Sequence, residues 1–213
     1  MSKEVSQLNS PCFTRDNLAL LLGGARRTLD YRISGLVAKG EIVVIKPGFY
    51  INTQKVANDQ SALESVSGVL VSPSYISLEY AMSRYGLIAE SAFGITCVTT
   101  KKPRKFISGG YSYIYRKIKP AMFFGYQTIG ESYIKYNLAY LYKALVDYIY
   151  LTPLGSAEAV NGLVLESRFN WDVFTSNDWL EFERCTLLLD SRKLAQVLKV
   201  LKKEGIYVPA GQN

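Results

Sequence analysis

Basic, aromatic and hydroxyl side chains gather on one face of a predicted helix near the N-terminus. At 100° per residue, Arg27, Tyr31 and Ser34 point away from the apolar residues of that helix, while Arg26 and Arg32 flank the apolar stripe. Arginine can form a two-point hydrogen bond with a guanine edge, worth roughly 1–3 kcal/mol of discrimination between bases. These side chains therefore predict contact with nucleic acid.

Two predicted helices separated by a glycine break position these side chains. The first helix is expected over 14–22, where Thr14 can accept hydrogen bonds from backbone N–H groups of the first turn. Its expected apolar face consists of Leu18, Leu21 and Leu22. Gly23-Gly24 allows the positive φ angles of a tight turn, and a second helix is expected over 25–39. Its expected buried stripe consists of Leu29, Ile33 and Leu36.

A β-hairpin is expected directly after the second helix. Gly40 suits the left-handed conformation that ends a helix, and Glu41 to Ile45 is rich in β-branched residues. Pro47-Gly48 suits a type II turn, after which Phe49 to Ile51 returns as a second strand. This order of helix, turn, helix and hairpin is typical of a winged helix-turn-helix.

In that fold the second helix enters the major groove and the hairpin lies along the DNA backbone. The residues expected to contact DNA are Arg26, Arg27, Tyr31, Arg32, Ser34 and Lys46. Lys46, on the hairpin, is expected to make a sequence-independent and salt-sensitive phosphate contact. Residues 1–57 carry eight basic and four acidic side chains, and Asp30 is the only acid on the groove-facing side. A protein-binding module of the same fold, with solvated arginines, is the alternative.

A second concentration of positive charge lies in the middle of the chain. Between Glu90 and Glu131 there is no acidic residue. The basic residues there are Lys101, Lys102, Arg104, Lys105, Arg116, Lys117 and Lys119. Such a stretch can attract a phosphate backbone or an acidic partner by long-range attraction. The alternative is a solvated loop around Pro103 beside an edge strand that charge protects against aggregation.

The chain lacks the residues of most common enzyme mechanisms. It contains no histidine, which excludes Ser-His-Asp and Cys-His nucleophile systems and HExxH metal sites. No phosphate-binding glycine loop occurs, and the three cysteines lack metal-ligand spacing, so they are expected to be buried apolar residues. We expect no catalytic residue, no metal and no cofactor, and hence no enzyme. A carboxylate-dependent nuclease stays formally open, with Asp147 and Asp172 among its candidate acids.

The expected fold class is α+β with two domains. Residues 1–57 are expected to form the winged helix-turn-helix, and residues 58–213 a mixed α/β domain with an antiparallel sheet and C-terminal helices. A polar linker is expected over 52–61. No apolar run reaches membrane-spanning length and no signal-peptide pattern begins the chain, so we expect a cytoplasmic protein without membrane contact.

Local patterns predict the elements of the second domain. Ser72-Pro73-Ser74 is expected to start a helix. Alternating tyrosines at Tyr111, Tyr113 and Tyr115 indicate a strand whose rings are half-buried, with stacking on nucleobases as the less favoured interpretation. Further strands are expected over 95–99, 121–126 and 132–136, and helices over 138–150 and 191–204.

The order of these motifs resembles a known family. The winged helix is followed by Ser72 to Ala81, by Tyr85 to Ile88, by Phe124-Gly125-Tyr126 and by Lys143 to Tyr150, as in the AbiE-type antitoxins. These are the regulatory halves of type IV toxin-antitoxin pairs in abortive infection, a phage defence. The resemblance covers roughly residues 10–155. The proline and glutamate that usually precede the Lys-Ala-Leu motif are replaced here by Leu141 and Tyr142.

The resemblance implies a repressor that binds inverted repeats in its own promoter as double-stranded DNA. It also implies a C-terminal domain that counteracts a nucleotidyltransferase-like toxin encoded beside it, without a stable complex between the two proteins. A stand-alone winged-helix regulator with a ligand-sensing C-terminal domain is the alternative. The presence or absence of a neighbouring nucleotidyltransferase gene separates these two hypotheses.

Overall fold

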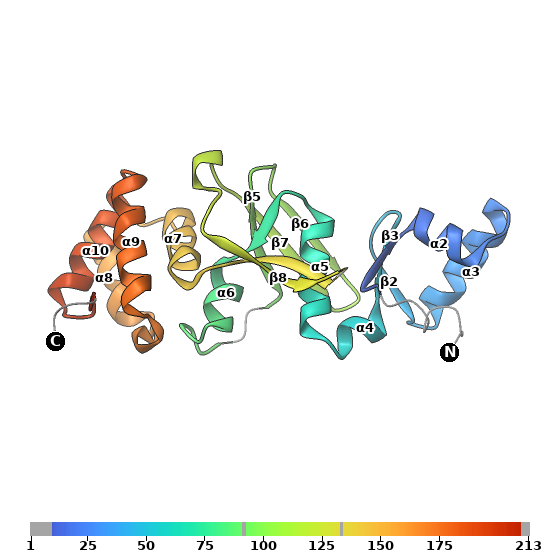
Figure 1. Cartoon of the computed structure of the whole chain (residues 1–213), viewed down its shortest axis with the longest axis horizontal. Helices are drawn as coiled ribbons and strands as arrows, with labels where there is room; N and C mark the ends of the chain where they lie inside the picture. Colours follow the sequence, from blue (N-terminus) through green and yellow to red (C-terminus); the bar gives the residue numbers. More distant parts are fainter. Residues whose placement is uncertain (1–9, 91–92, 133, 210–213) are drawn as a thin grey trace.

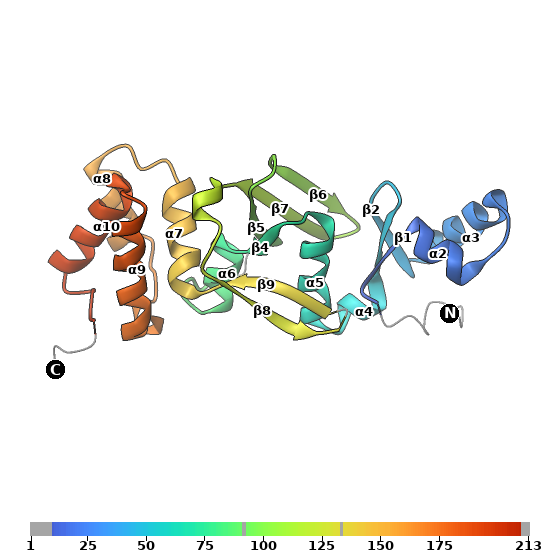
Figure 2. The same ribbon diagram turned by 45° about the horizontal axis from the view of Figure 1, so that its top comes forward.

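The computed structural model describes residues 10–90, 93–132 and 134–209. These residues combine helices and strands into an α/β structure with one antiparallel and one mixed sheet. Figures 1 and 2 show three parts that follow one another along the long axis: the N-terminal helices, the larger sheet and the C-terminal helices. The N-terminal helices therefore occupy one end of the molecule.

The N-terminal part contains two helices and a three-stranded antiparallel sheet of order β1-β3-β2. Its elements are β1 (Cys12–Thr14), α2 (Arg15–Leu22), α3 (Arg26–Ala38), β2 (Ile42–Lys46) and β3 (Phe49–Asn52). Thr14 caps α2, since its Oγ1 accepts from the backbone N–H of Asn17 at 3.2 Å. Gly23 and Gly24 have φ angles of 63° and 93°, which only glycine adopts readily, and the chain turns there into α3.

The apolar face of α2 is narrower than expected. Leu18 and Leu22 are buried, but Leu21 is 40% exposed. Leu18 and Leu22 are four residues apart and lie on one line of the helix, whereas Leu21 is rotated about 60° away from Leu18. The prediction that Leu21 joins this face is therefore wrong.

The three-stranded sheet packs on both of its faces. Phe13, Ile42 and Tyr50 belong to a small hydrophobic cluster with residues of α2 and α3. Cys12, Ile45, Phe49 and Ile51 instead belong to the large cluster that fills the rest of the molecule. The sheet thus connects the N-terminal helices to the remainder of the chain, and the domain boundary at residue 57 stays a prediction.

Two helices replace the expected polar linker. They are α4 (Thr53–Ala57) and α5 (Gln60–Leu70). The polar residues that suggest a linker are their N-caps: Asn52 accepts from the N–H of Lys55 at 3.3 Å, and Asp59 from that of Ala62 at 3.1 Å. A linker and a capped helix start share the same residue types, which explains the error.

The central sheet has the strand order β6-β7-β5-β4-β9-β8. Its strands are β4 (Ser74–Ile76), β5 (Ile95–Thr99), β6 (Arg104–Ser108), β7 (Tyr111–Lys117), β8 (Tyr126–Glu131) and β9 (Ile134–Ala139). The pairs β4–β9 and β5–β7 are parallel and the other pairs antiparallel, so the expected all-antiparallel sheet is wrong. Residue patterns identify strands but do not specify which strands pair, because pairing depends on distant segments.

Helices cover the two faces of this sheet. The hydroxyls of Tyr113 and Tyr115 donate to backbone carbonyls of α5 on one face. On the other face, Thr96 Oγ1 accepts from the N–H of Tyr80 in α6 (Leu78–Arg84) at 3.0 Å. Next to α6 lies α7 (Leu141–Leu151). Tyr113 and Tyr115 are fully buried, which favours packing over nucleobase stacking.

Three expected element starts are corrected. Ser74 begins strand β4 rather than a helix, because residues 74–76 are hydrogen-bonded between β5 and β9. Residues 121–126 contain the end of a 3₁₀ turn, η1 (Pro120–Met122), and only the first residue of β8. The helix expected from residue 138 begins at Leu141, since Leu138 and Ala139 still pair in β9. Tertiary pairing overrides local preference at each place.

Short helices form the C-terminal part. They are α8 (Ala157–Asn161), the π-helix η2 (Gly162–Glu166), the 3₁₀ turn η3 (Trp171–Val173), α9 (Ser176–Leu188) and α10 (Arg192–Lys203). The last helix agrees with the sequence prediction, with all four expected inward residues buried: Leu194, Val197, Leu198 and Leu201. This part ends the molecule opposite to α3 (Figure 1).

Candidate nucleic-acid interface

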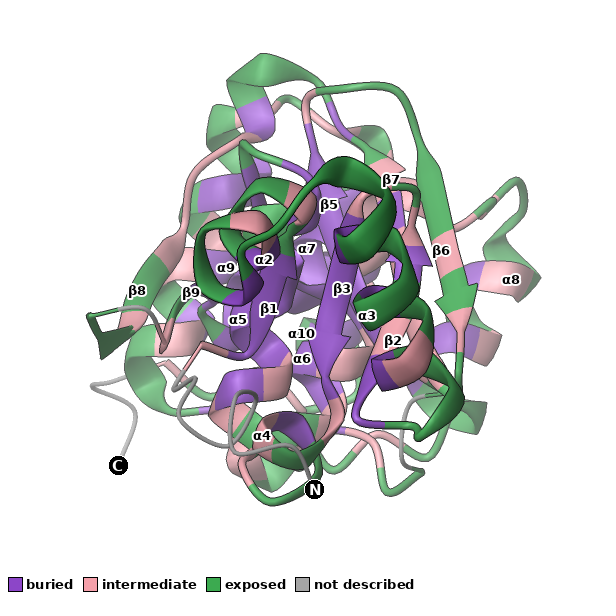
Figure 3. Ribbon diagram, turned by 90° about the vertical axis from the view of Figure 1, so that its right-hand side faces the viewer, coloured by how far each residue is buried: buried purple, intermediate pink, exposed green. Residues whose placement is uncertain are grey.

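Helix α3 exposes a continuous polar face at the end of the molecule. Figure 3 views this end directly and shows α3 largely in the colour of exposed residues. Arg26, Arg27 and Ser34 are exposed and Tyr31 is 82% exposed. The apolar stripe of Leu29, Ile33 and Leu36 is buried below. The side-chain directions therefore follow the predicted periodicity, while DNA contact itself stays a prediction.

The N-terminus of α3 has no side-chain cap. Its N-cap residue is Ala25, which cannot accept a hydrogen bond through its side chain, and the first turn contains no acid. The first N–H groups of any helix lack partners inside the helix, and together with the helix dipole they attract anions. Arg26 and Arg27 lie at this position. Sequence reasoning overlooked this site, although Ala25 in place of Ser, Thr, Asn or Asp is its visible signal.

The acid on this face is paired. Arg15 Nη2 donates to Asp30 Oδ1 at 2.5 Å, which joins the start of α2 to α3. A phosphate that approaches α3 therefore meets a compensated carboxylate. Arg15 is a further residue of this surface that sequence reasoning did not single out.

Arg32 also makes a contact inside the N-terminal part. Its Nη1 donates to the backbone carbonyl of Leu22, the last residue of α2. Carbonyls at a helix C-terminus lack intrahelical donors, so a guanidinium there satisfies an otherwise unpaired group. We infer that Arg32 helps to hold the angle between α2 and α3, while its expected contact with DNA stays a prediction.

Lys46 lies on the hairpin, as expected, at the end of β2, and contacts residues outside it. Its Nζ donates to the carbonyl of Leu70 at the end of α5 at 3.1 Å and lies 5.0 Å and 5.6 Å from the ring centroids of Phe49 and Phe106. Burial lowers the pKa of Lys46, and Arg104 lowers it further. The hairpin β2–β3 therefore packs on the central sheet through Lys46, and the expected phosphate contact of this residue stays a prediction.

The basic stretch lies on strands β6 and β7 and on the segments directly beside them, near one edge of the central sheet. Six of its seven residues are exposed: Lys101, Lys102, Arg104, Lys105, Lys117 and Lys119. Arg116 is half-buried and donates to the carbonyl of Leu151 at 2.9 Å. Strand β6 is one of the two edge strands, as the protective-charge alternative requires. This geometry is compatible both with binding of a phosphate backbone or an acidic partner and with protection of the edge strand against aggregation.

A buried polar cluster lies between β4 and α7. Lys143 and Asp147 are both completely buried and form an ion pair one helical turn apart. Tyr75 OH and Ser77 Oγ donate to Asp147 Oδ2 at 2.9 Å and 2.8 Å, and Lys143 Nζ donates to Tyr75 OH at 2.8 Å. Burial raises the pKa of the Asp147 carboxyl, and Lys143 and the hydroxyl donors oppose this rise. Both charges are compensated inside the protein.

Three motifs that carry the family resemblance meet at this cluster. Tyr75 and Ser77 come from the first motif, Lys143 and Asp147 from the last. The Phe124-Gly125-Tyr126 motif packs against the cluster. The ring centroid of Phe124 lies 5.1 Å from Lys143 Nζ, and Gly125 lies directly against the Lys143 side chain. Their common position indicates that these motifs build one core.

Alanine at position 125 is expected to destabilise the fold by about 1–3 kcal/mol. Gly125 has a φ of 73°, and an added Cβ would lie 2.9 Å from Lys143 Cγ. Urea denaturation of Gly125→Ala, with Gly155→Ala as the control in open space, measures this effect. Equal stability of Gly125→Ala and the unaltered protein would contradict the packing described for the cluster.

The candidate acids of a nuclease do not assemble. Asp147 is completely buried, so no substrate reaches it. Asp172 lies in the C-terminal part, far along the chain and beside aromatic residues. Among the described residues, no group of three or more histidine, cysteine or acidic side chains could hold a metal ion.

Similarity to known proteins does not indicate a function for this chain, so functional inference depends on the features described above. No protein-family model matches the chain, and no curated protein matches its sequence. In the described ranges, none of the helices has both the length and the apolar character needed to cross a membrane.

Proposed function

We propose that this chain is a DNA-binding antitoxin that represses its own operon. In this proposal β1 to β3 with α2 and α3 form a winged helix-turn-helix whose α3 reads double-stranded DNA at inverted repeats of its promoter. The exposed face with Arg26, Arg27 and Tyr31, at the uncapped helix N-terminus, carries this proposal. The protein acts in the cytoplasm, where the operon lies.

The shape and charge of this end support DNA binding. Backbone N–H groups and two arginines converge at the start of α3, and such groups position a protein on phosphates before side chains read bases. Ser34 extends the same exposed face along the helix. A reading surface this small achieves specific affinity through paired half-sites, so two molecules are expected on each operator.

The second activity in this proposal is relief of a nucleotidyltransferase-like toxin. We assign it to residues 58–213, where the buried cluster of Lys143, Asp147, Tyr75 and Ser77 stabilises a sheet with an exposed basic edge. The six exposed basic residues of the stretch from Lys101 to Lys119 are the surface we assign to antitoxicity. In this proposal the antitoxin relieves the toxicity without forming a stable complex with the toxin.

A stand-alone regulator with a ligand-sensing C-terminal domain is the second candidate function. The observation that favours it is an aromatic pocket between η3, α9 and the segment after α10. A ligand bound there could act on the DNA-binding end only through the intervening sheet, on which Lys46 fixes the hairpin.

A reporter gene under the promoter of this operon, combined with a growth assay, tests the proposal. The chain is expected to lower reporter expression and to restore growth when a nucleotidyltransferase encoded beside it is produced. Arg27→Ala is expected to lose repression and keep growth rescue. Loss of rescue with retained repression would contradict the proposed division between the two parts of the chain.

A further inference from the structure

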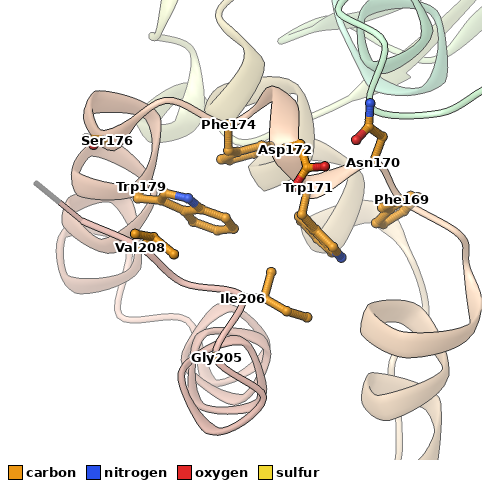
Figure 4. Close-up of a pocket in the computed structure, with 10 residues that line it drawn as sticks. All are labelled: Phe169, Asn170, Trp171, Asp172, Phe174, Ser176, Trp179, Gly205, Ile206 and Val208. Carbon is orange, nitrogen blue, oxygen red and sulfur yellow. The ribbon is translucent and has the colours of Figure 1, made fainter. Parts of the chain in front are cut away.

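A pocket of about 580 Å³ opens in the C-terminal part of the molecule. Figure 4 shows its lining: the Trp171 and Trp179 side chains flank the open space, Ile206 and Val208 lie along another side, and Asp172 lies beside Trp171. Small-molecule sites typically measure 300–1,000 Å³ and combine apolar walls with few polar groups. The pocket has the size of such a site, and its lining combines aromatic and aliphatic side chains with the polar Asn170, Asp172 and Ser176.

Buried aromatic packing fixes the indole of Trp171 at the pocket. The ring centroids of Trp171 and Trp179 are 5.9 Å apart, and those of Trp179 and Phe174 are 4.4 Å apart. Trp179 and Phe174 are buried, while Trp171 remains half-exposed. A partly exposed indole, held by contacts with neighbouring rings, therefore lines the pocket.

The charge of the pocket is opposite to that of the protein. The chain has a net charge of +7, yet among the described lining residues Asp172 is the only charged one. Within the described part of the chain, its exposed carboxylate has no ion pair or hydrogen bond. Tryptophan faces attract cations more strongly than other aromatic rings, and a neighbouring carboxylate adds to that attraction.

We propose that this pocket binds a small organic ammonium cation. In this site the apolar part of the ligand packs on Trp171, Ile206 and Val208, and its positive charge lies between the indole face and Asp172. The inference does not depend on DNA binding, because the pocket lies at the opposite end of the molecule from α3.

Intrinsic fluorescence can report this binding directly. The chain contains two tryptophans, and both line the pocket. Choline is the probe, and 3,3-dimethyl-1-butanol, which has the same shape without the charge, is its matched control at equal ionic strength. A saturable change with choline, at least about tenfold weaker with the neutral compound, is expected.

Charge-removing variants test the role of Asp172. Asp172→Asn is expected to weaken choline binding about tenfold, whereas Glu131→Gln, an exposed acid on the distant strand β8, is expected to leave it unchanged. Calorimetric titration provides a second readout that does not depend on tryptophan. Equal binding of both probes, equal binding by Asp172→Asn and the unaltered protein, or no saturable signal with choline by either method would each overturn the proposal.

Discussion

Arg27→Ala is expected to weaken operator binding by about 1–3 kcal/mol, roughly 10- to 100-fold, while the fold remains intact. The Arg27 side chain is exposed on α3 and is not part of the hydrophobic cluster below this helix. Its loss is therefore expected to remove a contact with DNA without creating a cavity. Gel-shift titration of the operator measures affinity, and thermal unfolding confirms that stability is unchanged.

Arg192→Ala is the matched control for this variant. Arg192 is also an exposed helical arginine, at the start of α10, so its replacement removes the same charge at the other end of the molecule. Its effect on operator affinity is expected to be small. If both variants weaken binding equally, the protein interacts with DNA through net charge alone, and the reading role of α3 is wrong.

The salt dependence of the Arg27 variant distinguishes two kinds of contact. A lost phosphate contact lowers the slope of log affinity against log salt by about one and weakens all sequences equally. A lost base contact leaves that slope nearly unchanged and relaxes specificity at one position. We expect the second result for Arg27 and the first for Arg26, which lies closer to the helix N-terminus.

Lys143→Met is expected to destabilise the fold by about 3–5 kcal/mol, because it leaves the Asp147 carboxylate buried without its counter-charge. That loss is a large share of the 5–15 kcal/mol typical of a folded domain. Tyr75 and Ser77 would still donate to Asp147, but hydroxyls do not neutralise its charge. Urea denaturation measures this change as a shift in the midpoint of the unfolding transition, while the dependence of the free energy of unfolding on urea concentration stays constant.

A double-mutant cycle completes this test. Lys143→Met with Asp147→Leu removes both charges, so the double variant is expected to lose less stability than the sum of the single variants. Lys199→Met, at an exposed position of α10, is the control for loss of a lysine. A change below about 1 kcal/mol for Lys143→Met would contradict the buried pair as described.

Local signals were sufficient to predict the helices of the N-terminal part and the last helix. Thr14 caps the first helix, and Gly23 and Gly24 adopt the positive φ angles that the turn requires. The spacing of Leu29, Ile33 and Leu36 also fixed which face of α3 is exposed. Each of these features depends on residues within about two helical turns, which is the range that sequence patterns describe.

Features that depend on distant contacts escaped prediction. Lys46 suits a solvated hairpin by its type, but the carbonyl of Leu70 lies within its reach only because β2 packs on the central sheet. The same holds for Lys143 and Asp147, whose spacing is that of an ordinary surface pair on a helix. Tyr75 reaches them from 68 and 72 residues away, and no local pattern records that approach.

Titrating the protein against the DNA just upstream of its own gene tests the central claim most directly. The titration is run at near-physiological salt with a shuffled competitor, because weak electrostatic binding disappears under those conditions. A specific shift that advances in two steps, one for each half-site, is the expected result. Binding that the shuffled competitor removes equally well, or that added salt abolishes, would contradict operator reading by α3.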